Sequence, residues 1–143
     1  MAYCVLTDLA KLLPNTMLIN LSNDTSGATV VNQDNIDEAI DQADREIDAY
    51  ILLAGKSVPM SPVPPLVANL STKMAIWNLH LRKYFDSSIW RETYKDCLKT
   101  LERIAEGKLS LGQEEIGVTQ EVGGGHATST RDQKFTEDFM KEY

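Results

Sequence analysis

The sequence predicts an all-α fold, a small bundle of about four helices followed by an extended C-terminal tail that needs a partner. Three observations support this. Apolar residues recur at three- and four-residue spacing in long stretches before residue 108, and good helix caps precede two of these stretches. Residues 28–31 could form a short extended segment, but no sheet is predicted. Length and composition fit one compact domain with an appendage, because 43% of the 143 residues are hydrophobic and 24% are charged.

The first predicted helix is short. Thr7 is a candidate N-cap, and Asp8 in the first turn suits the positive end of the helix dipole. Leu9, Leu12 and Leu13 would form its apolar face, and Pro14 discourages continuation. Small polar residues over 20–29 then predict a loop.

The second helix has the clearest signals. Asn32 can cap it, while Val31 and Ile36 match a hydrophobic staple around that cap. Gly55 ends it, because glycine accepts the positive φ of a helix C-terminus. One apolar stripe runs along it, formed by Ile36, Ala39, Ile40, Ala43, Ile47, Tyr50, Ile51 and Ala54.

The other side of this helix is acidic. Asp37, Asp41, Asp44 and Asp48 form a ladder for which three interpretations stay open. A solvated face is favoured over a divalent-metal site, because metal cages usually take ligands from several elements. The third interpretation is an acidic wall beside DNA, since like charge repels phosphate and lets DNA slide.

Four of the five prolines lie within 56–65, which predicts a stiff, extended crossover. Pro65 suits the first turn of a third helix. Its stripe of Leu66, Leu70, Met74, Trp77, Leu81 and Tyr84 is widened by Val67, Ala75, Ile76 and Leu79. A helix that is apolar around so much of its circumference is normally central to its bundle or shared with another subunit.

Asp86, Ser87 and Ser88 can cap a fourth helix, which Gly107 ends. Its apolar stripe comprises Trp90, Tyr94, Cys97, Leu98, Leu101, Ile104 and Ala105. Taken over the three long helices, the predicted core is Ile40, Ile47, Ile51, Leu70, Met74, Trp77, Leu81, Tyr94, Leu98 and Leu101.

Residues 1–108 are therefore predicted to form the helical domain, and 109–143 an extended tail. The tail has three consecutive glycines, few large apolar side chains and no period, so it cannot build its own core. Ordering it costs on the order of 1 kcal/mol per residue in backbone entropy, so we expect it to lie on another chain. Its last stretch supplies four candidate anchors, Phe135, Phe139, Met140 and Tyr143.

Charge is distributed unevenly. Residues 1–60 hold 9 acidic and 3 basic groups, 61–108 hold 5 and 8, and 109–143 hold 7 and 3, which gives −6, +3 and −4. Opposite segments can meet between copies of the chain. Phosphate-driven DNA binding is not expected, because it requires a concentrated basic surface.

No catalytic or cofactor site is predicted. The glycine run 123–125 lacks the lysine and hydroxyl residue of a phosphate-binding loop, and His80 and His126 have no ligand partners at metal spacing. Cys4 and Cys97 are interpreted as small buried residues of a protein from a reducing cytoplasm. No apolar run approaches the ~18 residues of a membrane span.

Several short motifs occur in a specific order. They are Tyr3-Cys4 with Asp8-Leu9, the run Ala39-Ile40, Ala43-Asp44, Glu46-Ile47-Asp48 and Tyr50-Ile51, then Pro62-Val63-Pro64-Pro65-Leu66, then Gly107-Lys108-Leu109-Ser110-Leu111-Gly112. This series resembles the small proteins encoded among the head genes of Mu-like tailed bacteriophages and prophages. That family is similar in size and helical order to the head–tail connector (adaptor) proteins of long-tailed phages.

The resemblance implies a structural virion protein without catalysis or cofactor, made in the bacterial host cytoplasm. It implies a homo-oligomeric ring, commonly of twelve copies, attached below the portal protein in the neck. Such a ring contacts the next neck protein (head closure or stopper) and continues the DNA channel without reading sequence. The ladder Asp37, Asp41, Asp44 and Asp48 is then the candidate lumen face, and the tail anchors would dock on the portal or a neighbour.

Two alternatives stay open. One is a head-closure or tail-completion protein further down the neck. The other is a cytoplasmic helical module, outside any phage, that binds another protein through its tail.

Overall fold

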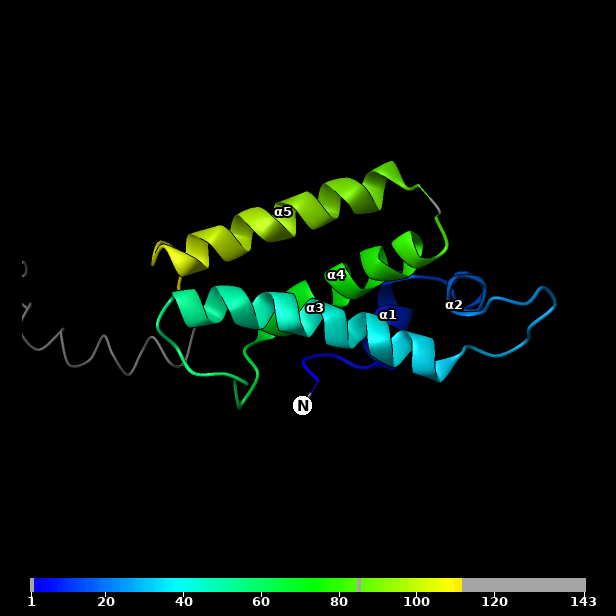
Figure 1. Cartoon of the computed structure of the whole chain (residues 1–143), viewed down its shortest axis with the longest axis horizontal. Helices are drawn as coiled ribbons and strands as arrows, with labels where there is room; N and C mark the ends of the chain where they lie inside the picture. Colours follow the sequence, from blue (N-terminus) through cyan, green and yellow to red (C-terminus); the bar gives the residue numbers. More distant parts are fainter. Residues whose placement is uncertain (1, 85, 112–143) are drawn as a thin grey trace, which may run out of the picture. The chain divides into compact units, whose positions relative to one another are not determined.

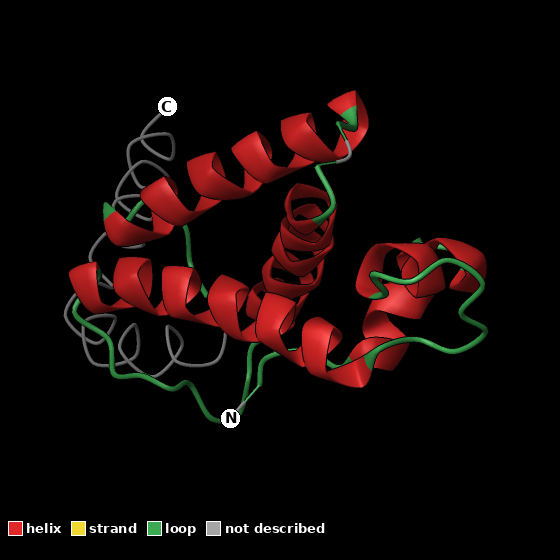
Figure 2. Ribbon diagram, turned by 45° about the vertical axis from the view of Figure 1, so that its right-hand side comes forward, coloured by secondary structure: helices red, strands yellow, loops and turns green. Residues whose placement is uncertain are grey.

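The computed structural model describes residues 2–84 and 86–111, which form five α-helices and no strand (Figures 1 and 2). The helices are α1 (Leu6–Leu12), α2 (Asn15–Ser22), α3 (Gln33–Leu53), α4 (Pro65–Arg82) and α5 (Ser88–Ala105). The predicted all-α fold is confirmed. The described residues up to Ser110 form one compact unit, and the predicted domain boundary after residue 108 stays a prediction. None of the described helices is long and apolar enough to cross a membrane.

α1 begins two residues earlier than its sequence suggests. Its N-cap is Val5, whose backbone N–H donates to the carboxylate of Asp8 at 3.0 Å, so Thr7 lies inside the helix and is not the cap. Leu9 and Leu13 are buried as predicted, whereas Leu12 is 45% exposed. The helix is thus fixed to the body by two of its three predicted leucines.

α2 was not predicted. It begins before the expected loop of 20–29 and takes in only its first residues, 20–22. Pro14 ends α1 but also serves as the N-cap of α2, whose Leu18 and Leu21 are fully buried. The C-terminal end of α2 receives two cationic donors from α4. Arg82 Nη1 donates to the carbonyl of Leu21 at 3.1 Å, and Lys83 Nζ to that of Asn23 at 2.7 Å. Positive charge is favourable there because of the helix dipole.

α3 follows its prediction closely. The side chain of Asn32 accepts from the backbone N–H of Asn35 at 3.3 Å, and Gly55 after the helix has a φ of 83°. Ile36, Ile47 and Ile51 are fully buried. The N-cap, the apolar stripe and the glycine stop are all confirmed.

α4 is central to the body, as the breadth of its apolar surface predicted. Pro64 is its N-cap and Pro65 its first residue, and the helix contacts α1, α2, α3 and α5. Figure 1 shows α3 and α5 running in the same direction, with α4 running back between them, and the second view in Figure 2 shows the same crossing. The capping of α5 by Ser87 is also confirmed, since its Oγ accepts from the N–H of Trp90 at 3.4 Å.

Most of the predicted core is buried. Ile40, Ile47, Ile51, Leu70, Met74, Trp77 and Leu101 are buried, whereas Tyr94 and Leu98 are only half-buried. Trp77 stacks against Tyr94 with ring centroids 6.1 Å apart. The placement of Leu81 in the core was wrong. It is 52% exposed at the rim of a polar groove lined by Asn35, Gln42 and Asn78, near the C-terminal end of α4.

Candidate functional site

The N-terminal segment is bound to α3 and to the proline-rich crossover through Tyr3. Its backbone N–H donates to Asp44 Oδ2 at 2.9 Å, and its phenolic hydroxyl donates to Asp48 Oδ1 at 2.5 Å. The same hydroxyl oxygen accepts from the backbone N–H of Met60 at 3.0 Å. The N-terminal segment is thus joined to two segments that lie more than 40 positions further along the chain. Burial, together with the hydrogen bond to Asp48, raises the pKa of Tyr3 to about 12.

Asp44 is a buried carboxylate at the contact of α3 with α4. Ser71 Oγ donates to its Oδ1 at 2.6 Å and lies 3.2 Å from Cys4 Sγ. Burial raises the pKa of Asp44, and the hydrogen bonds from Ser71 and Tyr3 oppose that rise. Each oxygen of this carboxylate accepts a hydrogen bond, so the group links the N-terminal segment to α4.

The acidic ladder is not one solvent-facing surface. Asp37 and Asp41 are exposed, but Asp44 is buried and Asp48 is half-buried against Tyr3, so the assignment of these last two to a solvent-facing wall was wrong. The spacing of four, three and four residues keeps the ladder on one side of the helix, within about 60°. Its second half is covered because the N-terminal segment packs there, with Tyr3 bonded to both carboxylates. Within residues 2–84 and 86–111, no three histidine, cysteine or acidic side chains are grouped to hold a metal ion.

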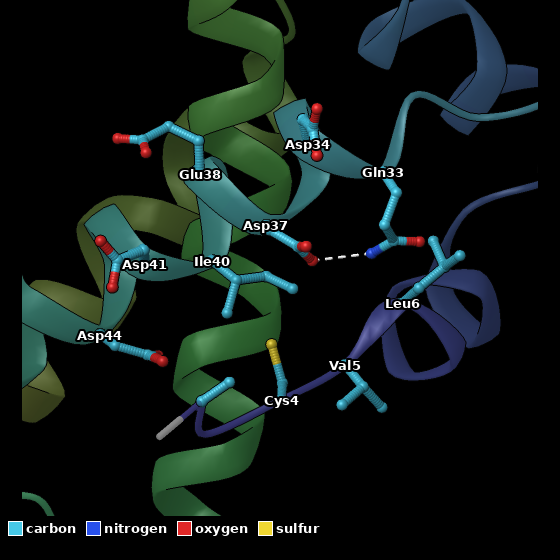
Figure 3. Close-up of a pocket in the computed structure, with 11 residues that line it drawn as sticks. Cys4, Val5, Leu6, Gln33, Asp34, Asp37, Glu38, Ile40, Asp41 and Asp44 are labelled. Carbon is cyan, nitrogen blue, oxygen red and sulfur yellow. Dashed lines mark hydrogen bonds between the residues drawn. The ribbon is translucent and has the colours of Figure 1, made fainter.

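A groove lies between the N-terminal segment and α3 (Figure 3). Its volume is about 460 Å³, and Val5, Leu6 and Ile40 give it apolar walls. Five of its eleven lining residues are acidic and none is basic. In Figure 3 Asp37 points along the groove and accepts from Gln33 Nε2 at 2.7 Å, whereas Glu38 points away from it.

A second exposed surface is the corner between α4 and α5, here the described residues of 81–91. Leu81, Tyr84 and Ile89 are 52%, 95% and 72% exposed, so the predicted inward position of Tyr84 was wrong. The physical reason is that α4 ends at Arg82, and the helical period no longer places the next residues. Tyr84 has a φ of 57°, in a region that non-glycine residues rarely adopt.

The two cysteines are buried and free, in agreement with their interpretation as small apolar residues. Burial raises the pKa of Cys4, and it raises that of Cys97 to about 11. Both thiols are therefore poor nucleophiles at neutral pH. His80 is also buried, with Nδ1 2.9 Å from the carbonyl of Ile76.

The tail anchors Phe135, Phe139, Met140 and Tyr143 and the second histidine, His126, lie outside the described residues. Their proposed binding role stays a prediction. Sequence reasoning missed the roles of Tyr3, Ser71 and Met60. The burial of Asp44 could have been predicted from the sequence, because Asp44 lies four residues after Ile40 and three before Ile47, within the apolar stripe.

Comparisons with known proteins agree with the motif series. The family model described as "Bacteriophage Mu, Gp36" matches residues 3–129, a span that begins at Tyr3 and includes Asp44, Asp48 and the crossover. The chain is also 29% identical over 99 residues to "Mu-like prophage FluMu protein gp36" of Haemophilus influenzae (strain ATCC 51907 / DSM 11121 / KW20 / Rd). That alignment covers 68% of this chain and 67% of the relative. With most of its length matched, from the tyrosine that binds α3 to a point well beyond α5, this chain belongs to the bacteriophage Mu Gp36 family.

Proposed function

We propose that this protein is a structural component of the phage neck, a head–tail connector whose copies form a ring under the portal and continue the DNA channel. Membership of a Mu-like phage family supports a virion role. The described residues also supply surfaces suited to assembly, because the body keeps several large apolar side chains in solvent. The role requires no catalysis and no cofactor.

The observation that carries the channel role is an exposed acidic stripe on α3. Asp34, Glu38 and Asp41 recur at four- and three-residue spacing, and all three are exposed. This stripe replaces the predicted ladder as the candidate lumen face, because Asp44 and Asp48 are held by Tyr3. Carboxylates repel DNA phosphates, so a wall that carries them lets the genome pass without holding it.

The proposed partners are further copies of the chain, with twelve expected from the family resemblance, the portal protein above and the next neck protein below. The tail anchors Phe135, Phe139, Met140 and Tyr143 would dock on the portal or on a neighbouring copy. Aromatic side chains that fill pockets dominate the binding energy of many interfaces.

The test is deletion of the gene from the phage or prophage that encodes it, followed by electron microscopy of the lysate. We expect DNA-filled heads without tails, rescued by the gene supplied from a plasmid. Normal virions would refute a neck role. Free tails with abnormal ends would instead support the alternative, a head-closure or tail-completion protein.

A variant test separates the channel role from assembly. Reversing the stripe with Asp34→Lys and Glu38→Lys should leave particle numbers unchanged and slow DNA release, because the lumen would then attract phosphate. The matched control reverses two exposed acidic residues of α5, Glu92 and Asp96. Equal effects of the two double variants would argue against a lumen position for the stripe.

A further inference from the structure

The C-terminal end of α3 and the crossover that follows it are exposed and almost without charge. Leu52 and Leu53, in the last turn of the helix, are 58% and 73% exposed, and Pro59 and Pro62 of the crossover are exposed as well. Residues 52–66 hold a single charged residue, although 24% of the whole chain is charged. We call these two leucines and two prolines the crossover surface. Exposed apolar groups on a backbone stiffened by proline are typical of a protein–protein contact, because little freedom is lost on docking.

The tail starts from the same end of the helical body. α3 and α5 run in the same direction and pack against each other, so Ala105, the last residue of α5, lies beside the end of α3 (Figures 1 and 2). Residues 106–110 follow at that end. The crossover leaves the end of α3 and turns back along the C-terminal half of the helix in both views. Each copy therefore carries the crossover surface and the start of its tail at one end.

The last residues of the sequence have the side chains that suit an apolar, uncharged surface. Phe135, Phe139 and Tyr143 stand four residues apart, and Met140 follows Phe139. This spacing aligns the three rings on one face of a helix that forms on binding. Aromatic side chains and methionine are enriched in the cores of interfaces. Three rings at about 150–250 Å² each approach the roughly 800 Å² that one partner buries in a standard interface.

The connection between the body and these anchors is long enough to reach a neighbour. Residues 112–134 are 23 residues, which span up to about 75 Å at about 3.3 Å per residue. This is more than twice the length of the 21-residue α3, about 32 Å. A contact within one copy would need only a short connection, because the tail starts from the end that carries the crossover surface. In a ring, neighbouring copies present that end at the same level, so the length favours the neighbour's surface.

We propose that residues 135–143 of one copy dock on the crossover surface of a neighbouring copy, with Phe139 against Leu52 and Leu53. The contact is heterologous, since each copy gives one tail and receives another, and a series of such contacts runs around the ring. The exposed acidic stripe of α3 lies earlier in the helix and takes no part, so it stays open toward the channel. This inference rests on the proposed connector function and names the surface to which the tail anchors bind.

The test uses full-length chains and measures the dissociation constant of self-association by sedimentation velocity at increasing concentration. Leu53→Asp should weaken self-association by about tenfold or more, because it places a charge at the centre of an apolar contact. The matched control is Val30→Asp, since Val30 is 70% exposed and precedes α3, at the other end of that helix. Circular dichroism confirms that each variant keeps its helix content.

The tail is tested by a second pair of variants. Phe139→Asp should weaken self-association to a similar degree, whereas Thr136→Asp, which adds the same charge off the aromatic spacing, should leave it unchanged. Self-association of the wild type should persist at high salt, because the contact is apolar and is not screened.

Mixing the two defective proteins is the decisive arm. Leu53→Asp keeps an intact tail, and Phe139→Asp keeps an intact crossover surface. Their mixture should form a one-to-one dimer and nothing larger, because the pair retains one working contact. Absence of that dimer, variants that associate as the wild type does, or a wild type that stays monomeric up to millimolar concentration would each overturn the inference. A monomeric wild type is the result expected if the tail binds its own copy or only the portal.

The two proposals fail separately. Normal virions after gene deletion refute the neck role whatever the association data show. Tailless particles combined with unaffected self-association of the variants refute only the contact between the tail and the crossover surface.

Discussion

Removing the hydroxyl of Tyr3 should weaken the fold far more than the loss of one atom suggests. In Tyr3→Phe the backbone bond to Asp44 remains, but the bonds to Asp48 and from Met60 both disappear. The phenyl ring fills the same buried space, since Tyr3 is only 4% exposed. The substitution therefore isolates the contribution of the hydroxyl.

The size of the destabilisation depends on what each hydrogen-bond partner of the hydroxyl can contact once the hydroxyl is gone. The N–H of Met60 is buried and loses its acceptor, which costs about 1–3 kcal/mol. Asp48 is half-buried and can recover water on its open side, so its loss is smaller, about 1 kcal/mol. Together they predict a decrease of about 2–4 kcal/mol in the free energy of unfolding.

Urea unfolding, followed by circular dichroism, measures this decrease as a lower midpoint with an unchanged slope. Tyr94→Phe is the matched control. Its hydroxyl makes one bond, to Glu46 at 2.8 Å, between two half-buried side chains, so its loss should cost about 1 kcal/mol. Equal losses in the two variants, or a loss below about 0.5 kcal/mol for Tyr3→Phe, would refute the reasoning.

The hydroxyl of Tyr3 also makes the free energy of unfolding depend on pH in the alkaline range. Burial, followed by the hydrogen bond to Asp48, raises the pKa of Tyr3 from 10.0 to about 12. Between these values the unfolded chain releases the proton and the folded chain keeps it, so stability is full below pH 10 and falls as the pH rises toward 12. The free energy of unfolding of Tyr3→Phe should decrease less steeply over this pH range. Part of the decrease should remain, because burial also raises the pKa of Tyr94.

Three further predictions follow from the described contacts. Leu79→Ala should cost about 2–5 kcal/mol in the free energy of unfolding, whereas Leu81→Ala should cost less than about 1 kcal/mol, because Leu79 is fully buried and Leu81 is 52% exposed. Arg82→Ala should cost about 1–2 kcal/mol and speed amide exchange in α2, since it removes the bond to Leu21 and the ion pair with Asp24. Cys97 should resist a thiol reagent at pH 8 in the native state and react after unfolding, because burial raises its pKa to about 11; fast native labelling would contradict its position.

The long helices could be predicted because their signals are local. Asn32 and Ser87 cap helices whose apolar spacing is regular, and Gly55 adopts the positive φ expected of a helix stop. α2 was missed because Pro14 was interpreted only as the end of α1. A proline also suits the residues at which a helix starts, so the same residue ends one helix and precedes the next.

The candidate site was less accessible to sequence reasoning because its contacts are distant along the chain. Tyr3 meets Asp44 and Met60 across 41 and 57 positions, and no local pattern reports such a pair. The acidic ladder was recognised, but Tyr3 and Ser71 cover Asp44, whereas Asp37 and Asp41 stay exposed. The corner with Tyr84 was misplaced for the opposite reason, since the apolar period was extended beyond the end of α4.

The long-range bonds of the N-terminal segment have a consequence during synthesis. Residue 4 precedes its neighbour Ser71 by 67 positions, so it leaves the ribosome well before that neighbour exists. At about 5–20 residues per second the wait is on the order of 3–13 s. Within this interval Asp44, Asp48 and Met60, the partners of Tyr3, are translated first, and Ser71 of α4 follows last. The contacts of the segment are therefore complete only after the first turns of α4 have been translated. Nascent chains halted before and after Ser71 should therefore differ in protease sensitivity at their first residues.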